Sequence, residues 1–296
     1  MIIRAGKREM IIDSHVHLFS QKVIENVSEK TGMVNRLYLR VEGAKERTGA
    51  DKLKQTMHRA QIAACLLLPT SGKDKVAVTN DRYWKITEDN PGLLTAGTLH
   101  PGYPDNHTQI ERFKDRGIKG IKFCSFSQGF ALDAPETLDL FHRLQQENRD
   151  RDHRFFVILD TFYESHQFFN TSPKYTTTPE RLGRLVKQYP GIPFIAAHMG
   201  GLRAPFEEIC SYLPPSQNLF LDTSNAGHTL AKQEFIHLLK RFGGERIIFG
   251  TDWPWFDPVS EVGLISRYLD EAGFSGKEKQ AVFAGNIGRL LGIELG

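Results

Sequence analysis

Two histidines stand two positions apart at the end of the first apolar run of the chain. Residues 10–18 read Met-Ile-Ile-Asp-Ser-His-Val-His-Leu, which places the imidazoles at His15 and His17. Because successive side chains of a strand alternate between its two faces, residues at i and i+2 point to the same side. Two neutral imidazoles on one face supply half of a binding site for zinc or a similar ion. Two solvated histidines at a strand end are the structural alternative.

Ionisable residues also follow several later apolar runs that read as strands. They are Lys122, Asp160, His198, Asp222 and Asp252. In an α/β barrel the C-terminal ends of the strands lie at one rim, where the chemistry takes place, so we expect these side chains to share a cavity. Each has a structural alternative, since a lone histidine is often bonded to backbone in the core and an aspartate after a strand often caps a turn or helix.

Apolar runs of strand length alternate along the chain with segments of helical spacing. The expected strands are 11–15, 62–68, 93–99, 118–123, 155–160, 193–197, 219–222 and 247–251. The expected helices are 51–60, 79–89, 107–116, 135–148, 179–188, 203–211 and 229–242, with more from 259 onward. This alternation predicts an α/β fold with parallel strands. Eight such units close most naturally into a (β/α)8 TIM barrel, although a doubly wound open sheet gives nearly the same pattern.

Two connections are longer than a barrel needs. They cover 19–50 after the first strand and 161–178 after the fifth. Long connections of this kind on a compact barrel usually act as lids or contact the substrate, with a packed surface loop as the alternative.

Composition indicates a soluble globular protein formed by a single domain over 1–296. The chain has 296 residues, of which 40% are hydrophobic and 25% charged, and its formal net charge is +3. Lys and Arg are scattered among Asp and Glu, which argues against a nucleic-acid groove or an anionic membrane surface. The apolar runs are far shorter than the roughly 20 residues of a membrane helix. A small-molecule partner is therefore expected, and a homodimer is left open.

Cysteine usage and the first residues bear on the compartment. Cys65, Cys124 and Cys210 are widely spaced and odd in number, which favours reduced thiols and a cytoplasmic protein. Met1-Ile-Ile and Met10-Ile-Ile are near duplicates, so we interpret 1–9 as an extended or non-native start.

Five short motifs are spread over nearly the whole chain. They are Asp13-x-His15-x-His17, Gly120-Ile-Lys-Phe, Ala197-His-Met-Gly-Gly, Phe249-Gly-Thr-Asp-Trp-Pro and Gly285-Asn-Ile-Gly-Arg-Leu-Leu. This set resembles the amidohydrolase superfamily, in the amidohydrolase-related branch that includes decarboxylases of aromatic and muconic acids, hydrolases and lactonases. We expect Asn286 in the last motif to cap a helix rather than to take part in catalysis.

The resemblance implies that His15 and His17 bind a metal, that His198 is catalytic, and that Asp252 binds the metal and also handles a proton. The family commonly has a histidine after strand five, where this chain has Asp160. If Asp160 replaces it, two imidazoles and two carboxylates hold one divalent ion, with zinc first and manganese or iron as alternatives. Otherwise the site is degraded and the protein works without a metal.

The Lys122 side chain has three possible roles. A positive charge for a substrate carboxylate ranks first, and a carbamylated bridge between two metals, as in the binuclear members of the superfamily, ranks second. A salt bridge to a neighbouring aspartate is the structural alternative. Trp253, with the aromatic residues near it, is expected at the mouth of the site, and we also assign Asp222 to substrate binding.

These parts predict a metal-dependent hydrolase. A divalent ion lowers the pKa of a water molecule toward about 7 and polarises a carbonyl, which favours attack on a C–N or C–O acyl or lactone bond of a small unsaturated or aromatic carboxylic acid. A metal-dependent non-oxidative decarboxylase of an aromatic or muconic acid is the first alternative, and a metal-independent lactonase is the second. A metal-dependent nuclease would need a basic groove, and a catalytically inactive barrel that binds a ligand is the last alternative.

Overall fold

The computed structural model describes residues 2–3, 10–149 and 153–295, and the chain divides into two compact units. Unit 1 comprises Met1–Leu68, Ile86–Leu94 and Asp222–Gly296, and unit 2 comprises Pro69–Lys85 and Thr95–Leu221. Strands and helices alternate in both, which confirms the predicted α/β class. A single domain over the whole chain stays a prediction. Apart from the strand at Ile2–Ile3, the proposed extended start lies outside the described residues.

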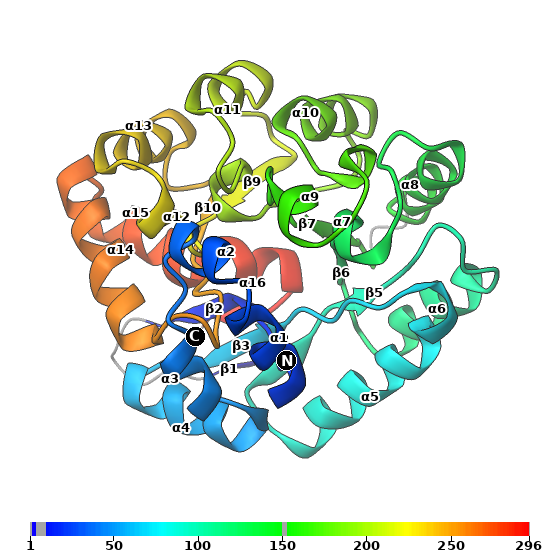
Figure 1. Cartoon of the computed structure of the whole chain (residues 1–296), viewed down its shortest axis with the longest axis horizontal. Helices are drawn as coiled ribbons and strands as arrows, with labels where there is room; N and C mark the ends of the chain where they lie inside the picture. The colour runs from blue at the N-terminus through cyan, green and yellow to red at the C-terminus, as the bar shows by residue number, and fades with distance from the viewer. Residues whose placement is uncertain (1, 4–9, 150–152, 296) are drawn as a thin grey trace. The chain divides into compact units, whose positions relative to one another are not determined.

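Unit 2 is built on parallel strands that lie in the order β5-β6-β7-β8-β9 (Figure 1). Their bounds are β5 Gly97–Thr98, β6 Gly120–Phe123, β7 Phe156–Leu159, β8 Phe194–Ala196 and β9 Leu219–Asp222, the last ending at the boundary with unit 1. The register pairs Lys122 with Ile158, and Leu159 with Ala196. Parallel strands in register bring their carboxyl ends to one edge, so Lys122, Asp160 and His198 begin from neighbouring positions.

The longer helices of unit 2 lie close to the predicted positions, whereas the four-residue helices at Ser125–Gln128 and Ser165–Phe168 were not predicted, and the second of them lies in the predicted long connection 161–178. Their bounds are α6 Asn106–Asp115, α7 Ser125–Gln128, α8 Pro135–Glu147, α9 Ser165–Phe168, α10 Pro179–Gln188 and α11 Phe206–Tyr212, with short turns η1 Lys73–Lys75, η2 Pro173–Tyr175 and η3 His198–Gly200. Helix α10 begins as its sequence indicates, because Thr178 accepts a hydrogen bond from the Arg181 backbone at 3.2 Å and Pro179 occupies the first turn.

Strand β2 (Ile12–Val16) is the central element of unit 1. It pairs in parallel with β3 (Ala64–Leu67), which pairs in turn with β4 (Leu93–Thr95). On its other side β2 is bonded to the segment 249–253, which follows β10 (Ile247–Ile248). The bonds are Ser14 N to Phe249 O at 3.0 Å, Asp252 N to His15 O at 2.9 Å, and His17 N to Trp253 O at 2.8 Å. The backbone therefore fixes Asp252 beside His15.

Helices surround these strands of unit 1. Their bounds are α1 Gln21–Ser28, α2 Thr31–Arg36, α3 Val41–Glu46, α4 Gly49–Ala60, α12 Ala226–Thr229, α13 Lys232–Phe242, α14 Pro258–Ala272, α15 Gly276–Gln280, the π-helical η4 Ala281–Gly285 and α16 Asn286–Leu291. Helix α5 (Val76–Asp89) begins in unit 2 and ends in unit 1, and a short β1 pairs with β11 (Glu294–Leu295). Helix α14 contacts both α13 and α4 (Figure 1).

The connection 19–50 is helical where the sequence predicted only a long loop. It contains α1, α2 and α3, which bury just Ile24, Met33 and Ala44, respectively. These helices are only 8, 6 and 6 residues long, so each gives at most about two turns of apolar spacing, which is too little to predict a helix.

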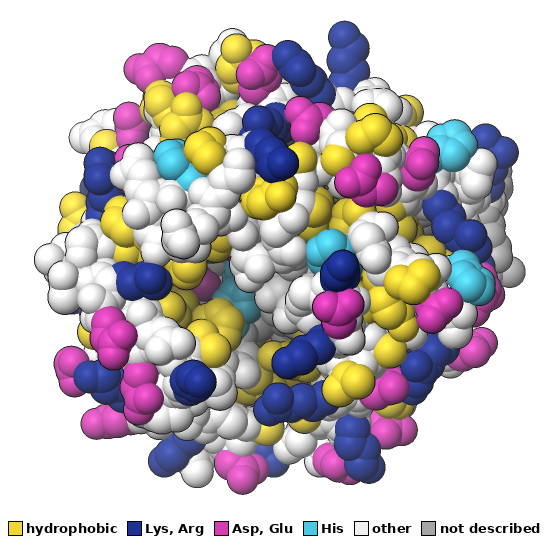
Figure 2. All heavy atoms as spheres, turned by 45° about the vertical axis from the view of Figure 1, so that its right-hand side comes forward, with side chains coloured by type: hydrophobic (Ala, Val, Ile, Leu, Met, Phe, Trp, Pro, Cys, Tyr) yellow, Lys and Arg dark blue, Asp and Glu magenta, His cyan; other side chains and the backbone are white. Residues whose placement is uncertain are grey.

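The charged side chains visible in Figure 2 are interspersed, with Lys and Arg beside Asp and Glu rather than collected in one patch on that face. Within the described part of the chain, none of the helices has the length and the apolar composition needed to cross a bilayer.

Asn286 joins the start of α16 to the backbone before and within β10. Its buried side chain donates to Gly244 O at 2.7 Å and to Ile247 O at 2.8 Å. Asn286 therefore has a structural role, as predicted, but its side chain links two segments of the backbone instead of capping a helix.

We expect Asn286→Asp to lower the free energy of unfolding by roughly 3 kcal/mol, because both donors are lost and a carboxylate is buried against two carbonyls. Denaturant unfolding measures the change, with the exposed Asn35→Asp as a control that stays within about 0.5 kcal/mol. Equal effects for the two variants would contradict this role of Asn286.

Candidate metal centre

His15, His17 and Asp252 form a compact buried group in unit 1. The two Nε2 atoms are 3.1 Å apart, and Asp252 Oδ1 lies 3.6 Å from His17 Nε2 and 4.0 Å from His15 Nε2. Among the described residues this is the one set of three or more His, Cys, Asp or Glu side chains whose ligand atoms all lie within 4.8 Å of one another. Two imidazoles and a carboxylate thus converge on one point.

The second nitrogen of each ring is already engaged. His15 Nδ1 lies 2.8 Å from Asp222 Oδ2, and His17 Nδ1 lies 3.3 Å from Leu68 O. A carboxylate and a carbonyl can only accept hydrogen bonds, so both Nδ1 atoms carry a proton. In a neutral ring the opposite nitrogen is then unprotonated, which leaves both Nε2 lone pairs facing each other.

Two lone pairs at 3.1 Å repel unless a cation lies between them. With metal–nitrogen bonds of about 2.05 Å, ligand angles between 90° and tetrahedral separate two imidazole nitrogens by about 2.9–3.3 Å, so the observed separation fits a shared ion. This donor set suits zinc, and manganese or iron as well. Without a metal, one ring would have to bind a second proton and donate it to the other.

Asp13 and Gly250 set the spacing between the two segments that carry this group. The Asp13 carboxylate accepts hydrogen bonds from His15 N at 3.2 Å, Thr251 N at 3.0 Å and Thr251 Oγ1 at 2.6 Å. Burial raises the pKa of Asp13 to about 7, although these hydrogen bonds oppose the shift. A Cβ at Gly250 would lie 2.7 Å from His15 Cβ, so the close approach of the two segments requires glycine.

Asp222 lies beside the His15 ring, and its predicted contact with a substrate stays a prediction. It is buried, holds His15 Nδ1, and accepts hydrogen bonds from the backbone and hydroxyl of Ser224. Ser224 Oγ also lies 3.1 Å from His15 Nδ1. Sequence reasoning missed this pairing, although a histidine ligand usually has an acceptor for its other nitrogen and a carboxylate after a strand was an available signal.

Aromatic side chains continue from the metal group. The His17 ring stacks on Phe19 at 4.7 Å, and Phe19 contacts Trp255 at 5.6 Å. Trp253 is fully buried, so its indole lies inside the protein rather than at an open mouth, and its Nε1 has no hydrogen-bond partner among the described residues. Its predicted contact with a substrate stays a prediction.

A second group, formed by Lys122, Asp160 and His198, lies at the carboxyl ends of β6, β7 and β8 in unit 2. Asp160 Oδ2 is 3.9 Å from Lys122 Nζ and 3.8 Å from His198 Nε2. The ammonium group of Lys122 is fully buried and makes no hydrogen bond within the described part of the chain. Asp160 therefore faces two nitrogen donors, and its predicted place as a fourth metal ligand stays a prediction.

The comparisons with known proteins agree with this picture. An amidohydrolase family model matches residues 12–293. Among curated protein sequences, none matches this chain. An uncharacterized TIM-barrel protein from Bordetella bronchiseptica shares the fold at a TM-score of 0.72 and 15% identity, over 96% of this chain and 98% of that one. This likeness confirms the predicted TIM-barrel fold.

Two further structures with this fold contain metals. A dihydroxybenzoic acid decarboxylase from Polaromonas sp. JS666, with bound manganese and the inhibitor 2-nitroresorcinol, has 15% identity and a TM-score of 0.68 over 96% of this chain and 97% of that one. An amidohydrolase from Burkholderia multivorans with bound zinc has 15% identity and a TM-score of 0.67 over 96% of this chain and 100% of that one. We conclude that this chain is an enzyme that belongs to the amidohydrolase family.

Proposed function

We propose that this enzyme is a metal-dependent hydrolase that attacks an acyl C–N or C–O bond, lactones included, of a small unsaturated or aromatic carboxylic acid. The observation that carries the proposal is the 3.1 Å distance between His15 Nε2 and His17 Nε2. The Nδ1 atom of each ring is already hydrogen-bonded, and Asp252 lies beside the pair. A divalent ion held by His15, His17 and Asp252, zinc first and manganese next, would polarise the scissile carbonyl and make a water molecule more acidic.

Asp252 is the residue proposed to move the proton. Its backbone N–H is bonded to His15 O at 2.9 Å, and its carboxylate is largely withdrawn from solvent. A carboxylate fixed in this way accepts a proton from the attacking water and returns it to the leaving nitrogen or oxygen.

Three residues of unit 2 have side chains whose chemistry suits substrate binding and catalysis. Lys122 offers a buried ammonium group without a hydrogen-bond partner among the described residues, which suits the carboxylate of the substrate. His198 is proposed to stabilise the developing oxyanion or to supply a proton to the leaving group. The Asp160 carboxylate lies within 4 Å of the Lys122 and His198 nitrogens and places a negative charge beside both.

Non-oxidative decarboxylation is the second candidate. A manganese-containing dihydroxybenzoic acid decarboxylase shares the fold, which favours this candidate, and the buried Lys122 ammonium group would suit the carboxylate of its substrate as well. In this reaction the bond between the ring carbon and the carboxylate breaks, its electron pair stays on carbon, and His198 or Asp252 protonates that carbon as carbon dioxide leaves.

Metal content tests the proposed centre directly. We expect protein purified without added metal to contain about one equivalent of a divalent transition metal, and His15→Ala and His17→Ala to lose it, because each change removes a ligand. Elemental analysis measures this, with the exposed His107→Ala as the matched control that keeps its metal. Folded wild-type protein that is active without any metal would contradict the proposal and favour a metal-independent lactonase.

Asp222 provides a test of ring orientation. Asp222→Ala removes the acceptor from His15 Nδ1, so we expect a 10- to 100-fold weaker affinity for zinc, measured by competition with a chelator. The exposed Asp133→Ala should bind zinc as the wild type does. Unchanged zinc affinity in Asp222→Ala would show that Asp222 does not position a metal ligand.

Asp252→Asn keeps the shape of the side chain but cannot accept a proton. We expect kcat to fall by roughly 100- to 10,000-fold, measured with esters, lactones and amides of unsaturated and aromatic acids in isotopically labelled water, while Asp133→Asn stays near wild type. Label in the carboxylic acid product supports hydrolysis. Carbon dioxide release from the free acids, with no oxygen of the labelled water in the decarboxylated product, would replace hydrolysis with the decarboxylase candidate.

A further inference from the structure

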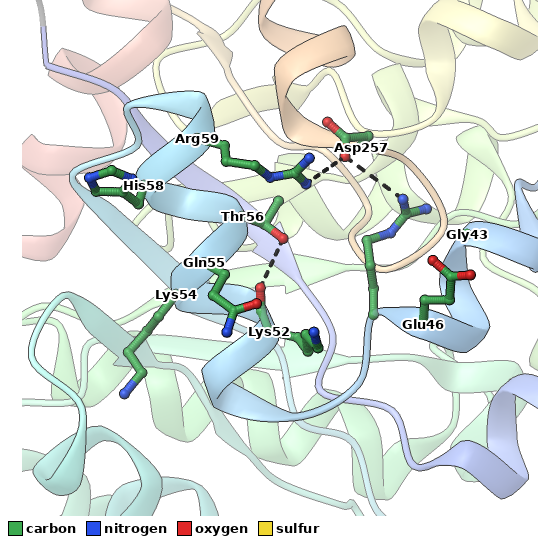
Figure 3. Close-up of a pocket in the computed structure, with 10 residues that line it drawn as sticks. Gly43, Glu46, Lys52, Lys54, Gln55, Thr56, His58, Arg59 and Asp257 are labelled. Carbon is green, nitrogen blue, oxygen red and sulfur yellow. Dashed lines mark hydrogen bonds and ion pairs between the residues drawn. The ribbon is translucent and has the colours of Figure 1, made fainter.

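A pocket of about 800 Å³ with an excess of positive charge lies in unit 1, along α3 and α4 and beside the start of α14 (Figure 3). Its charged lining residues are Glu46, Arg47, Lys52, Lys54, Arg59 and Asp257. Four of them are basic and two are acidic, which leaves the pocket positive at neutral pH. None of them belongs to the groups described above.

The periodicity of α4 gathers part of this charge. Lys52, Thr56 and Arg59 stand at i, i+4 and i+7, so they share one face of the helix, and all three line the pocket. Lys54 is paired with Asp51 at 3.2 Å, whereas the structure shows no ion pair for Lys52 among the described residues. Lys52 is therefore available to a ligand.

Arg47 supplies a donor that the protein itself does not use. Its Nε donates to Pro254 O at 3.0 Å, and its Nη1 lies 3.8 Å from Asp257 Oδ2, but its buried Nη2 has no hydrogen-bond partner among the described residues. A Cβ at Gly43 would lie 2.8 Å from this Nη2, so the guanidinium group occupies space that a side chain at position 43 would fill.

One carboxylate serves two guanidinium groups here. Asp257 Oδ2 lies 3.0 Å from Arg59 Nη2 as well as 3.8 Å from Arg47, while its Oδ1 accepts a hydrogen bond from Val259 N at the start of α14. Glu46 is exposed, and Figure 3 draws no ion pair from it to the other residues shown. Burial lowers the pKa of Arg47 and the nearby Arg59 adds to this effect, whereas Asp257 and Glu46 oppose it.

We propose that this pocket binds a small oxyanion, phosphate or carboxylate, between Arg47, Arg59 and Lys52. Guanidinium and ammonium groups form charge-assisted hydrogen bonds with phosphate and carboxylate oxygens, and Arg47, Arg59 and Lys52 all line this pocket. Because Arg47 also holds Pro254, two residues after Asp252, a bound anion would brace the segment that carries Asp252. The site is inferred from its own geometry and does not depend on the proposed reaction.

Isothermal titration calorimetry of the full chain with inorganic phosphate, and separately with succinate, tests the site. We expect millimolar or tighter binding of at least one of them, weakened at least ten-fold by Arg47→Gln and by Lys52→Glu, and unchanged by the exposed Lys277→Gln. The anion that binds more tightly shows whether the site prefers a phosphate or a carboxylate.

If Arg47→Gln fails to fold, Lys52→Glu still tests the proposal, because the Lys52 side chain is exposed. Absence of binding by both anions, or binding that Lys52→Glu leaves unchanged, would overturn the proposal. Metal content serves as a separate readout, because the Lys52→Glu variant should keep the metal even when anion binding is lost.

Discussion

The approach of His15 Nε2 to His17 Nε2 at 3.1 Å is the constraint on which the account of this enzyme depends. Each ring is oriented at Nδ1 by a group that can only accept a hydrogen bond, Asp222 for one and Leu68 O for the other. Unit 1 is arranged to keep this geometry, because β2 is bonded on both sides and Gly250 permits the close approach. A cation is the simplest way to satisfy two nitrogens that would otherwise repel.

The carboxylates around these histidines have separate tasks because their surroundings differ. Asp13 is fully buried and bonded to the Thr251 backbone and hydroxyl, so it joins two segments of backbone. Asp222 orients a ring, and only Asp252 has an oxygen facing both Nε2 atoms. In unit 2, the Asp160 carboxylate, 3.9 Å from the buried Lys122 ammonium group, offsets the desolvation of that group only partly, and we propose that a substrate carboxylate supplies the remaining contact.

Much of this structure could be predicted from local sequence patterns. Helix α10 begins and ends where its Thr-Pro start and apolar spacing indicated. The predicted strands reappear, except that 93–99 divides into β4 and β5, which belong to different sheets. The pairing of Asp222 with His15 was not predicted: Asp222 was expected at the same rim, but no local pattern shows which side chain, 207 residues away, contacts the His15 ring. The burial of Trp253 was missed because an aromatic residue after a strand suits a pocket mouth and a core equally well.

Anomalous diffraction at the zinc absorption edge, from crystals of the full chain saturated with zinc, tests the central claim most directly. The account predicts one strong peak about 2.0–2.1 Å from Nε2 of both His15 and His17, with an Asp252 oxygen as a further ligand. Zinc-saturated crystals with no peak at this position, and with the two rings joined by an Nε2–H···Nε2 hydrogen bond, would contradict it.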